Sequence, residues 1–465
     1  MHVKTYTYGK IPIEIWEFPA LLMLLIFIFF IAGYIKRSKL PNKPEYKYFL
    51  WGLWAKVIGG LFFAGVYIFY YGQADTTSYY ECALAYANMF FHNFSDFLVV
   101  YLGGGTEEIK SIFTGDTGSP MWYMFSDDKT RMVIKLLVPL LIIGGKSYFI
   151  TTVLVSTLTY SGLWSLYRMF VRYFPEFKRN LALGILFMPS VIFWGGGILK
   201  DSFTLAATCY FIVATNRFIM KEGNVVGRVI LLLASGFVIV SIKPYILIIL
   251  LPGTMVWFFA SRIRKIKNKF FRYVIVPFIY IFVIGGTYGV LTTLSDSLGK
   301  FAPEKALQTA VVIQQDLKQE YYDGNSFDIG EFEATPLSIL AKAPLAIEAG
   351  LFRPYLWESR NVVMLFSGLE NTVILLLTLA VVILLVMSLS KGTGLVAFFA
   401  GHPLLLYSLT FSLLFAFMIG VTTSNFGALV RFKIPLIPLY MACIIILLGH
   451  LRVRRSQLGK QRFLQ

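Results

Sequence analysis

Residues 18–43 read FPALLMLLIFIFFIAGYIKRSKLPNK, an apolar run that ends in a cluster of basic residues. A helix needs ~20 mostly apolar residues to cross a bilayer, and the run at 18–34 approaches this length. No small-residue cleavage pattern follows it, so we predict a retained membrane span rather than a signal peptide. Similar runs recur along the whole chain. The predicted fold class is therefore an all-α polytopic membrane protein.

The composition supports this prediction. Of the 465 residues, 57% are hydrophobic and 14% are charged, and the mean hydropathy is +0.69; soluble globular proteins have about 45–50% and about 25%. Three scattered cysteines, Cys82, Cys209 and Cys443, argue against a disulfide framework or a zinc ribbon. The net charge of +17 is distributed between apolar runs, which argues against nucleic-acid binding.

We predict about eleven transmembrane helices from the apolar windows that are long enough to cross a bilayer. They cover residues 18–34, 48–71, 148–167, 181–198, 202–218, 227–242, 244–260, 273–293, 368–388, 403–421 and 433–449.

The basic residues predict the orientation of these spans, because positively charged loops stay in the cytoplasm. More than half of the Lys and Arg residues fall in alternate loops, with few acidic residues among them. This pattern places the N-terminus outside, the C-terminus inside, and two long loops, 72–147 and 294–367, on the outer face. The chain then divides into four consecutive parts. They are an extra N-terminal span with a basic loop (1–47), a transmembrane core (48–293), the second outer loop (294–367) and the C-terminal spans with a basic tail (368–465).

The two outer loops are far longer than a simple connection requires, and loops beyond ~12–15 residues are usually functional or disordered. The first contains an amphipathic stretch, 78–100, and an apolar stretch, 132–143, that is too short to cross the membrane and is broken by Pro139. We predict that both form helices in the outer interface. The second loop contains a polar, helix-like run, 303–322.

Asp75 is the first candidate for chemistry, because an ionisable residue beside a membrane span is costly and usually functional. It follows the span 48–71 in GQADTTSYYE, with Tyr79 one helical turn later as a supporting residue. The structural alternative for Asp75 is an N-cap of the helix that follows.

Asp201, in WGGGILKDSFT, is the second candidate carboxylate. It lies in a tight turn between two predicted spans and is therefore expected at the outer surface. Glycines 195–197 predict a flexible hinge and close backbone approach, and Lys200 is the predicted ion-pair partner of Asp201. The alternative is a cap on the next span with a neutralising lysine.

Several cations are predicted on the outer face, where positive charge is disfavoured. Snorkelling explains any one of them but explains a whole group less well. We predict that this group binds the substrate or its phosphate. Its members are Lys200, Lys243 with Tyr245 in SIKPYILI, Arg353 and Arg360 with the supporting Tyr355 in FRPYLWESR, and Arg431 in NFGALVRFKIP.

Two carboxylates and several cations on one membrane face suit group transfer from an anionic, lipid-linked donor. A carboxylate can deprotonate an acceptor hydroxyl, and Lys or Arg can hold the phosphate that leaves. In the alternative, Asp75 and Asp201 together hold a divalent cation, Mg²⁺ or Mn²⁺.

This order of features resembles the GT-C class of integral membrane glycosyltransferases. In the resemblance, DTTSYY carries the first acidic site, Asp75, at the start of a long outer loop, and the KDS turn carries the second, Asp201. The resemblance covers residues 48–370 and lacks the usual pair of adjacent acids at the first site. It implies a polyprenyl-phosphate or diphosphate sugar donor, a glycan, lipid or protein acceptor, and a place in polysaccharide biosynthesis at the cell envelope. The site would face the periplasm from a bacterial inner membrane.

Three other functions remain open. The ending NFGALVRFKIPLIPLY also resembles O-antigen and exopolysaccharide polymerases or ligases, which rely on outer-face arginines such as Arg353 and Arg431. A transporter or flippase of a lipid-linked anion needs charges inside its spans, where we find Lys56 and Glu370, and we expect Lys56 to snorkel toward the cytoplasm. A structural or assembly role is the third.

Overall fold

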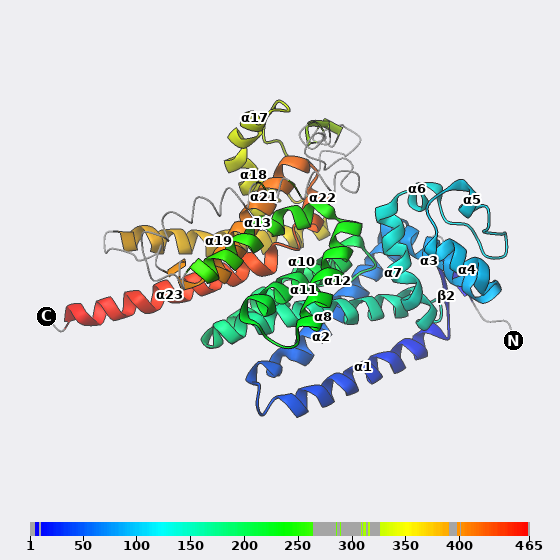
Figure 1. Ribbon diagram of the computed structural model, residues 1–465, viewed down its shortest axis with the longest axis horizontal. Coiled ribbons are helices and arrows are strands. Elements are labelled where there is room, and N and C mark those ends of the chain that lie inside the picture. The colour runs from blue at the N-terminus through cyan, green and yellow to red at the C-terminus, as the bar shows by residue number, and fades with distance from the viewer. Residues whose placement is uncertain are drawn as a thin grey trace. The chain divides into compact units, whose positions relative to one another are not determined.

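The computed structural model of the protein describes residues 5–8, 11–263, 326–389 and 401–463, together with isolated positions at 285, 289, 308, 310–312, 315, 316, 398 and 399. Helices dominate these residues (Figure 1). The two described strands, β1 (Thr5–Tyr8) and β2 (Ile11–Glu14), pair antiparallel ahead of the first helix. The prediction of an all-α membrane protein is therefore confirmed at the level of fold class.

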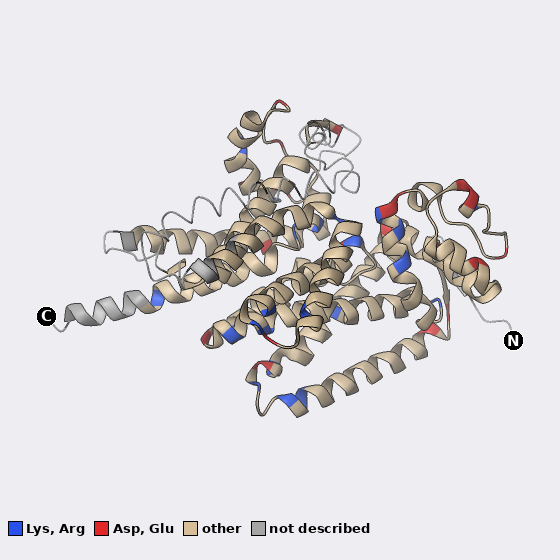
Figure 2. Cartoon of the chain, viewed as in Figure 1, with Lys and Arg blue, Asp and Glu red and all other residues tan. Residues whose placement is uncertain are grey.

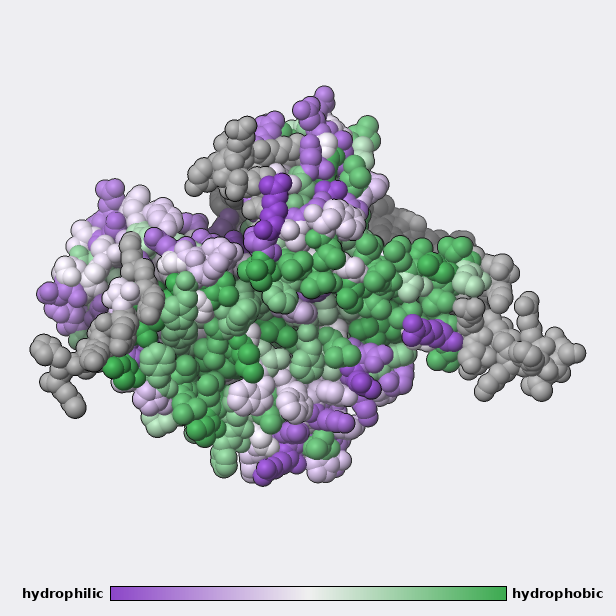
Figure 3. All heavy atoms as spheres, turned by 180° about the vertical axis from the view of Figure 1, so that it is seen from behind, coloured by the Kyte–Doolittle hydropathy of each residue, from purple (hydrophilic) through white to green (hydrophobic). Residues whose placement is uncertain are grey.

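Seven described helices are long and apolar enough to cross a membrane. They match seven of the predicted spans. They are α1 (Glu17–Lys39), the run Pro44–Tyr71 formed by η1 (Pro44–Tyr48), α2 (Phe49–Gly65) and η2 (Val66–Tyr71), α8 (Tyr148–Tyr173), α11 (Lys200–Met220), α12 (Val225–Ile242), α19 (Val362–Leu389) and α21 (Pro403–Thr422). In Figure 2 the middle of α1 carries no charged residue, whereas its last turn carries basic ones. Figure 3 shows one face on which hydrophobic side chains cover a broad area, as helices facing lipid require.

Three other predicted spans have different outcomes. The span 433–449 corresponds to a bent pair, α22 (Phe426–Phe432) and α23 (Ile437–Phe463), with a bend of 69°. The span 244–260 corresponds to α13 (Pro244–Ile263), a shorter apolar helix. The span 273–293 and the predicted helix 303–322 lie mostly outside the described residues.

The predicted span 181–198 is wrong as a single helix. The chain instead forms η3 (Pro175–Phe177), α9 (Lys178–Leu186) and α10 (Pro189–Phe193). Pro189 has no N–H to continue α9 and disfavours the helical conformation of the residue before it. The glycines that follow then prevent α10 from extending.

The first predicted outer loop folds into several helices. They are α3 (Asp75–His92), α4 (Phe94–Leu102), α5 (Glu107–Lys110), α6 (Trp122–Phe125) and α7 (Asp128–Ile143). The single stretch predicted at 78–100 is thus two helices, because Asn93 ends α3 and caps α4 by accepting from Ser95 N at 3.0 Å. Most of α3 is buried, and α3 packs on α7.

Pro139 does not break α7, contrary to the prediction. A proline cannot donate to the carbonyl four residues earlier, which here belongs to Lys135. The Tyr101 hydroxyl from α4 donates to this carbonyl at 2.9 Å and so replaces the missing hydrogen bond. The helix therefore continues to Ile143.

The chain forms two compact units. The first comprises residues 1–168, 191–210 and 234–243, and the second comprises residues 169–190, 211–233 and 244–465. In the first, α2, α3, α7 and the start of α8 supply much of the buried apolar core. In the second, α18 (Ala343–Phe352), which follows α17 (Pro336–Ala341), packs closely on α21. An added Cβ at Gly420 would come within 2.0 Å of the Ala346 carbonyl oxygen.

In the first unit, the segment before Asp201 is fixed by side-chain donors. Ser156 donates to the Gly196 carbonyl at 2.6 Å, and Ser202 donates to the Gly197 carbonyl at 2.6 Å. Lys56 is 1% exposed and donates to the Val191 carbonyl at 2.8 Å, so the prediction that Lys56 snorkels is wrong. The predicted close backbone approach is confirmed, and it gives a packed turn in place of a flexible hinge.

Gly196→Ala is expected to lower the free energy of unfolding by about 1–3 kcal/mol, the usual cost of overpacking a core. A Cβ at Gly196 would lie 2.9 Å from Gly60 Cα and 2.7 Å from the Ile192 carbonyl oxygen, both backbone atoms. Thermal unfolding in detergent measures the change. The control is Gly104→Ala, where nothing lies within 4 Å. Equal melting temperatures for both variants would contradict the close approach.

Candidate active site

The start of α3 positions Asp75. The N-cap is Ala74, and Thr77 Oγ1 accepts from the Ala74 N–H at 3.0 Å, so Asp75 is the first helical residue and not the cap. Its carboxylate is exposed and lies in the first turn, where the helix dipole favours negative charge. Tyr79 lies one helical turn later, as predicted, and is buried.

Asp201 and Lys243 form a buried ion pair. The Lys243 Nζ lies 2.5 Å from Asp201 Oδ1, and the two side chains are 8% and 3% exposed. Asp201 is the second residue of α11, and Lys243 forms the predicted turn between α12 and α13. From the sequence we predicted that Lys200 is the ion-pair partner of Asp201. In the structure, the ion pair described for Lys200 is with Asp127.

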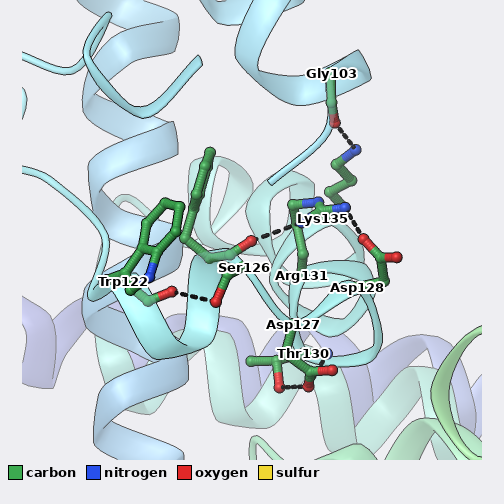
Figure 4. A network of polar contacts seen from close by, with 9 residues as sticks. Gly103, Trp122, Ser126, Asp127, Asp128, Thr130, Arg131 and Lys135 are labelled. Carbon is green, nitrogen blue, oxygen red and sulfur yellow. Dashed lines mark hydrogen bonds and ion pairs between the residues drawn. The ribbon is translucent and has the colours of Figure 1, made fainter. Parts of the chain in front are cut away.

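Lys200 reaches the start of α7. Its Nζ donates to Thr130 Oγ1 at 2.7 Å and lies 3.3 Å from Asp127 Oδ2. Asp127 also caps α7, because its carboxylate accepts from the Thr130 N–H at 3.0 Å and from the Thr130 hydroxyl. Figure 4 shows Asp127 and Thr130 turned toward one another. Electrostatic interactions link Lys200 to Asp75 and Lys243 as well.

The charge of Lys200 acts on Asp127. Burial raises the pKa of this carboxyl, but the hydrogen bonds from Thr130 and the positive charge of Lys200 outweigh that effect, so its pKa lies below the usual value. Sequence reasoning missed Asp127 and Thr130. The stretch SDDKT ahead of an apolar helix indicates a cap, and nothing in it indicates contact with residue 200.

The first unit therefore gathers four predicted residues from segments far apart in sequence: Asp75, Lys200, Asp201 and Lys243. We call these four, together with Asp127 and Thr130, the acid–lysine cluster. The C-terminal part of α8 and the N-terminal end of the run Pro44–Tyr71 are joined by a different ion pair, in which Arg168 and Glu45 lie 3.5 Å apart. The cluster thus belongs to one end of the helices in this unit, where one exposed carboxylate lies near a partly exposed ammonium.

The cluster fits a divalent cation poorly. Lys243 already bonds to the Asp201 carboxylate, and Lys200 adds a second ammonium nearby. A cation would have to displace or neutralise these positive charges. The cluster carries three carboxylates and two ammoniums, so a phosphate could bind only where a lysine leaves its carboxylate partner.

The other predicted residues belong to the second unit. Arg353 lies 3.5 Å from both Glu348 and Glu358, so two carboxylates already balance its charge. Tyr355 donates to Glu348, and burial together with this hydrogen bond raises the pKa of Tyr355 to about 12. This group holds the chain after α18 in place.

Three more predicted residues belong to the second unit. Arg360 is exposed between η6 (Leu356–Glu358) and α19. Arg431, on α22, lies over the Phe432 ring at 5.2 Å. Tyr245, on α13, contacts the Phe415 ring at 6.2 Å.

The second unit also holds a buried polar network. Lys433 is 1% exposed and donates to Asn371 at 2.5 Å and to the Arg353 carbonyl at 3.0 Å. Glu370 accepts from the Ser190 N–H and hydroxyl, both at 2.6 Å. These groups join α10, α18, α19 and the bend before α23. The sequence drew attention to Glu370 as an intramembrane charge but gave no sign of its partners.

Comparison of the chain with protein-family models, with curated proteins and with solved structures finds no significant match.

Proposed function

We propose that this chain is an integral membrane glycosyltransferase. It transfers a sugar or glycan from a polyprenyl-phosphate or diphosphate donor to an acceptor at the outer face, which is the periplasmic face in a bacterial inner membrane. The single observation that carries the proposal is the acid–lysine cluster, in which an exposed carboxylate and a partly exposed ammonium lie at one end of membrane-length helices. The distribution of basic residues supports an outer location for that end.

Asp75 is the proposed general base. It accepts the proton of the acceptor hydroxyl while the hydroxyl oxygen bonds to the anomeric carbon of the sugar. The bond from that carbon to the phosphate oxygen breaks, and both electrons leave with the phosphate. A lysine ammonium of the cluster stabilises the charge that develops on this phosphate.

Asp201 has a different role from the one its sequence suggests. Its carboxylate is buried against Lys243 and is not available to take a proton from an acceptor. The pair instead fixes the start of α11 relative to the end of α12, so that Lys200 projects toward Asp127. We assign Asp201 a positioning role, and the proposed reaction uses only side chains of the chain.

The function is tested with purified protein in liposomes that contain radiolabelled polyprenyl-phosphate or polyprenyl-diphosphate sugars and a crude acceptor fraction. The expected result is release of the polyprenyl phosphate with transfer of the label, unaffected by EDTA. If the reaction required a metal ion, EDTA would abolish transfer of the label, and added Mg²⁺ or Mn²⁺ would restore it. Failure to consume either donor would overturn the proposal.

The outer location of the cluster makes a separate prediction. Gly115→Cys lies in an exposed part of the loop that contains α3–α7, and Lys39→Cys lies at the exposed, basic C-terminal end of α1. An impermeant maleimide added to intact cells should label the first variant and spare the second, with the reverse result in inverted vesicles. The native cysteines are buried and give little background. Labelling of Gly115→Cys only from the inside would contradict the orientation.

A further inference from the structure

The two lysines of the acid–lysine cluster differ in how firmly they are held. Lys243 and Asp201 are both almost fully buried, with their charged atoms 2.5 Å apart. Lys200 and Asp127 are 22% and 45% exposed, with a longer separation of 3.3 Å. The first pair is enclosed by protein, and the second borders on solvent.

This difference determines which lysine can exchange partners. Separating a buried ion pair leaves an uncompensated charge in a medium of low dielectric constant, which is strongly unfavourable. An exposed ion pair contributes little, because water replaces each partner when they separate. Lys200 can therefore leave Asp127 for an incoming anion, whereas Lys243 stays with Asp201.

The start of α7 does not depend on Lys200. Asp127 still caps the helix through Thr130 after the lysine has moved. Arg131 donates to the Phe125 carbonyl at 2.6 Å, and Lys135 donates to the Gly103 carbonyl at 3.0 Å. Figure 4 shows both contacts, and neither involves Asp127 or Thr130. The exchange thus leaves the surrounding fold intact.

We infer that Lys200 is the side chain that binds the phosphate of the lipid donor, and that Asp127 is its resting partner and competes with that phosphate. This inference rests on the proposed function and refines it. Of the two cluster lysines that the sequence predicted as phosphate ligands, it keeps Lys200 and excludes Lys243, and it gives Asp127 control of donor affinity. Asp75, whose charge interacts with that of Lys200, is then the carboxylate available to act at the sugar that the phosphate carries.

The test measures binding of radiolabelled polyprenyl phosphate to the full-length protein in nanodiscs, with polyprenol as the uncharged control lipid. Asp127→Asn should tighten binding by about twofold to fivefold, the range an exposed ion pair accounts for. Asparagine caps a helix as well as aspartate does, so α7 is retained. Lys200→Met should weaken binding by about tenfold to a hundredfold, as expected for a hydrogen bond to a charged group.

The double variant Asp127→Asn/Lys200→Met separates competition from a structural effect. If Asp127 acts by competing for Lys200, the gain from Asp127→Asn disappears once Lys200 is gone. A gain that persists in the double variant would overturn the inference. So would a Lys200→Met variant that binds as tightly as the wild type.

A second probe, dodecyl phosphate, distinguishes the inference from the proposed function. Binding of dodecyl phosphate that depends on Lys200 and Asp127, without binding of polyprenyl phosphate, would support the lysine exchange and overturn the polyprenyl donor. Binding of polyprenyl phosphate that is insensitive to both residues would support the donor and overturn the exchange.

Discussion

Asp75→Asn is expected to lower the rate of sugar transfer by about 10²- to 10⁴-fold, because this is the contribution of a general base to such reactions. Asparagine has nearly the same shape but cannot accept the acceptor's proton. The donor should still bind, since the proposed ligand of its phosphate is Lys200 and not this carboxylate. Single-turnover transfer from a bound labelled donor measures the rate, and equilibrium binding of polyprenyl phosphate measures the affinity separately.

The structure separates the effect of Asp75→Asn on catalysis from an effect on helix capping. Because Ala74 is the N-cap, Asp75→Asn leaves the cap in place, and loss of the negative charge in the first turn should cost about 0.3–1 kcal/mol of stability. The matched control is Asp116→Asn, an exposed carboxylate in the same predicted outer loop, which should leave the rate unchanged. A tolerated Asp75→Asn combined with loss of activity in Arg353→Ala would favour a polymerase.

Hydropathy predicted the long helices well, but it did not predict where a helix breaks or continues. The window 181–198 is apolar enough to be a span, but hydropathy records composition and not the missing N–H of Pro189. At Pro139 the error was the opposite, because we predicted a break and the helix continues. The hydroxyl of Tyr101, 38 positions before Pro139, donates to the carbonyl that the proline cannot reach. Only tertiary structure reveals such a donor.

Four of the six residues of the acid–lysine cluster were predicted from the sequence, but its ion pairs were not. Lys200 and Asp201 are neighbours in sequence, but consecutive residues of a helix point about 100° apart and do not face each other. Their partners, Asp127 and Lys243, are 73 and 42 positions away. Lys56 illustrates the same limit, since its acceptor is a carbonyl 135 positions distant.

Lys243→Met is expected to lower the free energy of unfolding by about 3–5 kcal/mol, the cost of removing one partner from a buried ion pair. Asp201 would then keep a buried carboxylate without the ammonium 2.5 Å away. The double variant Asp201→Asn/Lys243→Met removes both charges and should recover most of this loss, because neutral replacements of a buried pair are often well tolerated. Denaturant titration in mild detergent gives the four free energies of the cycle.

Lys200→Met is the matched control. It removes a lysine from the exposed pair with Asp127 and should cost less than about 1 kcal/mol. Losses that simply add in the double variant would show that Asp201 and Lys243 do not stabilise each other. Equal losses for Lys243→Met and Lys200→Met would remove the energetic difference on which the assignment of Lys200 as the exchanging lysine depends.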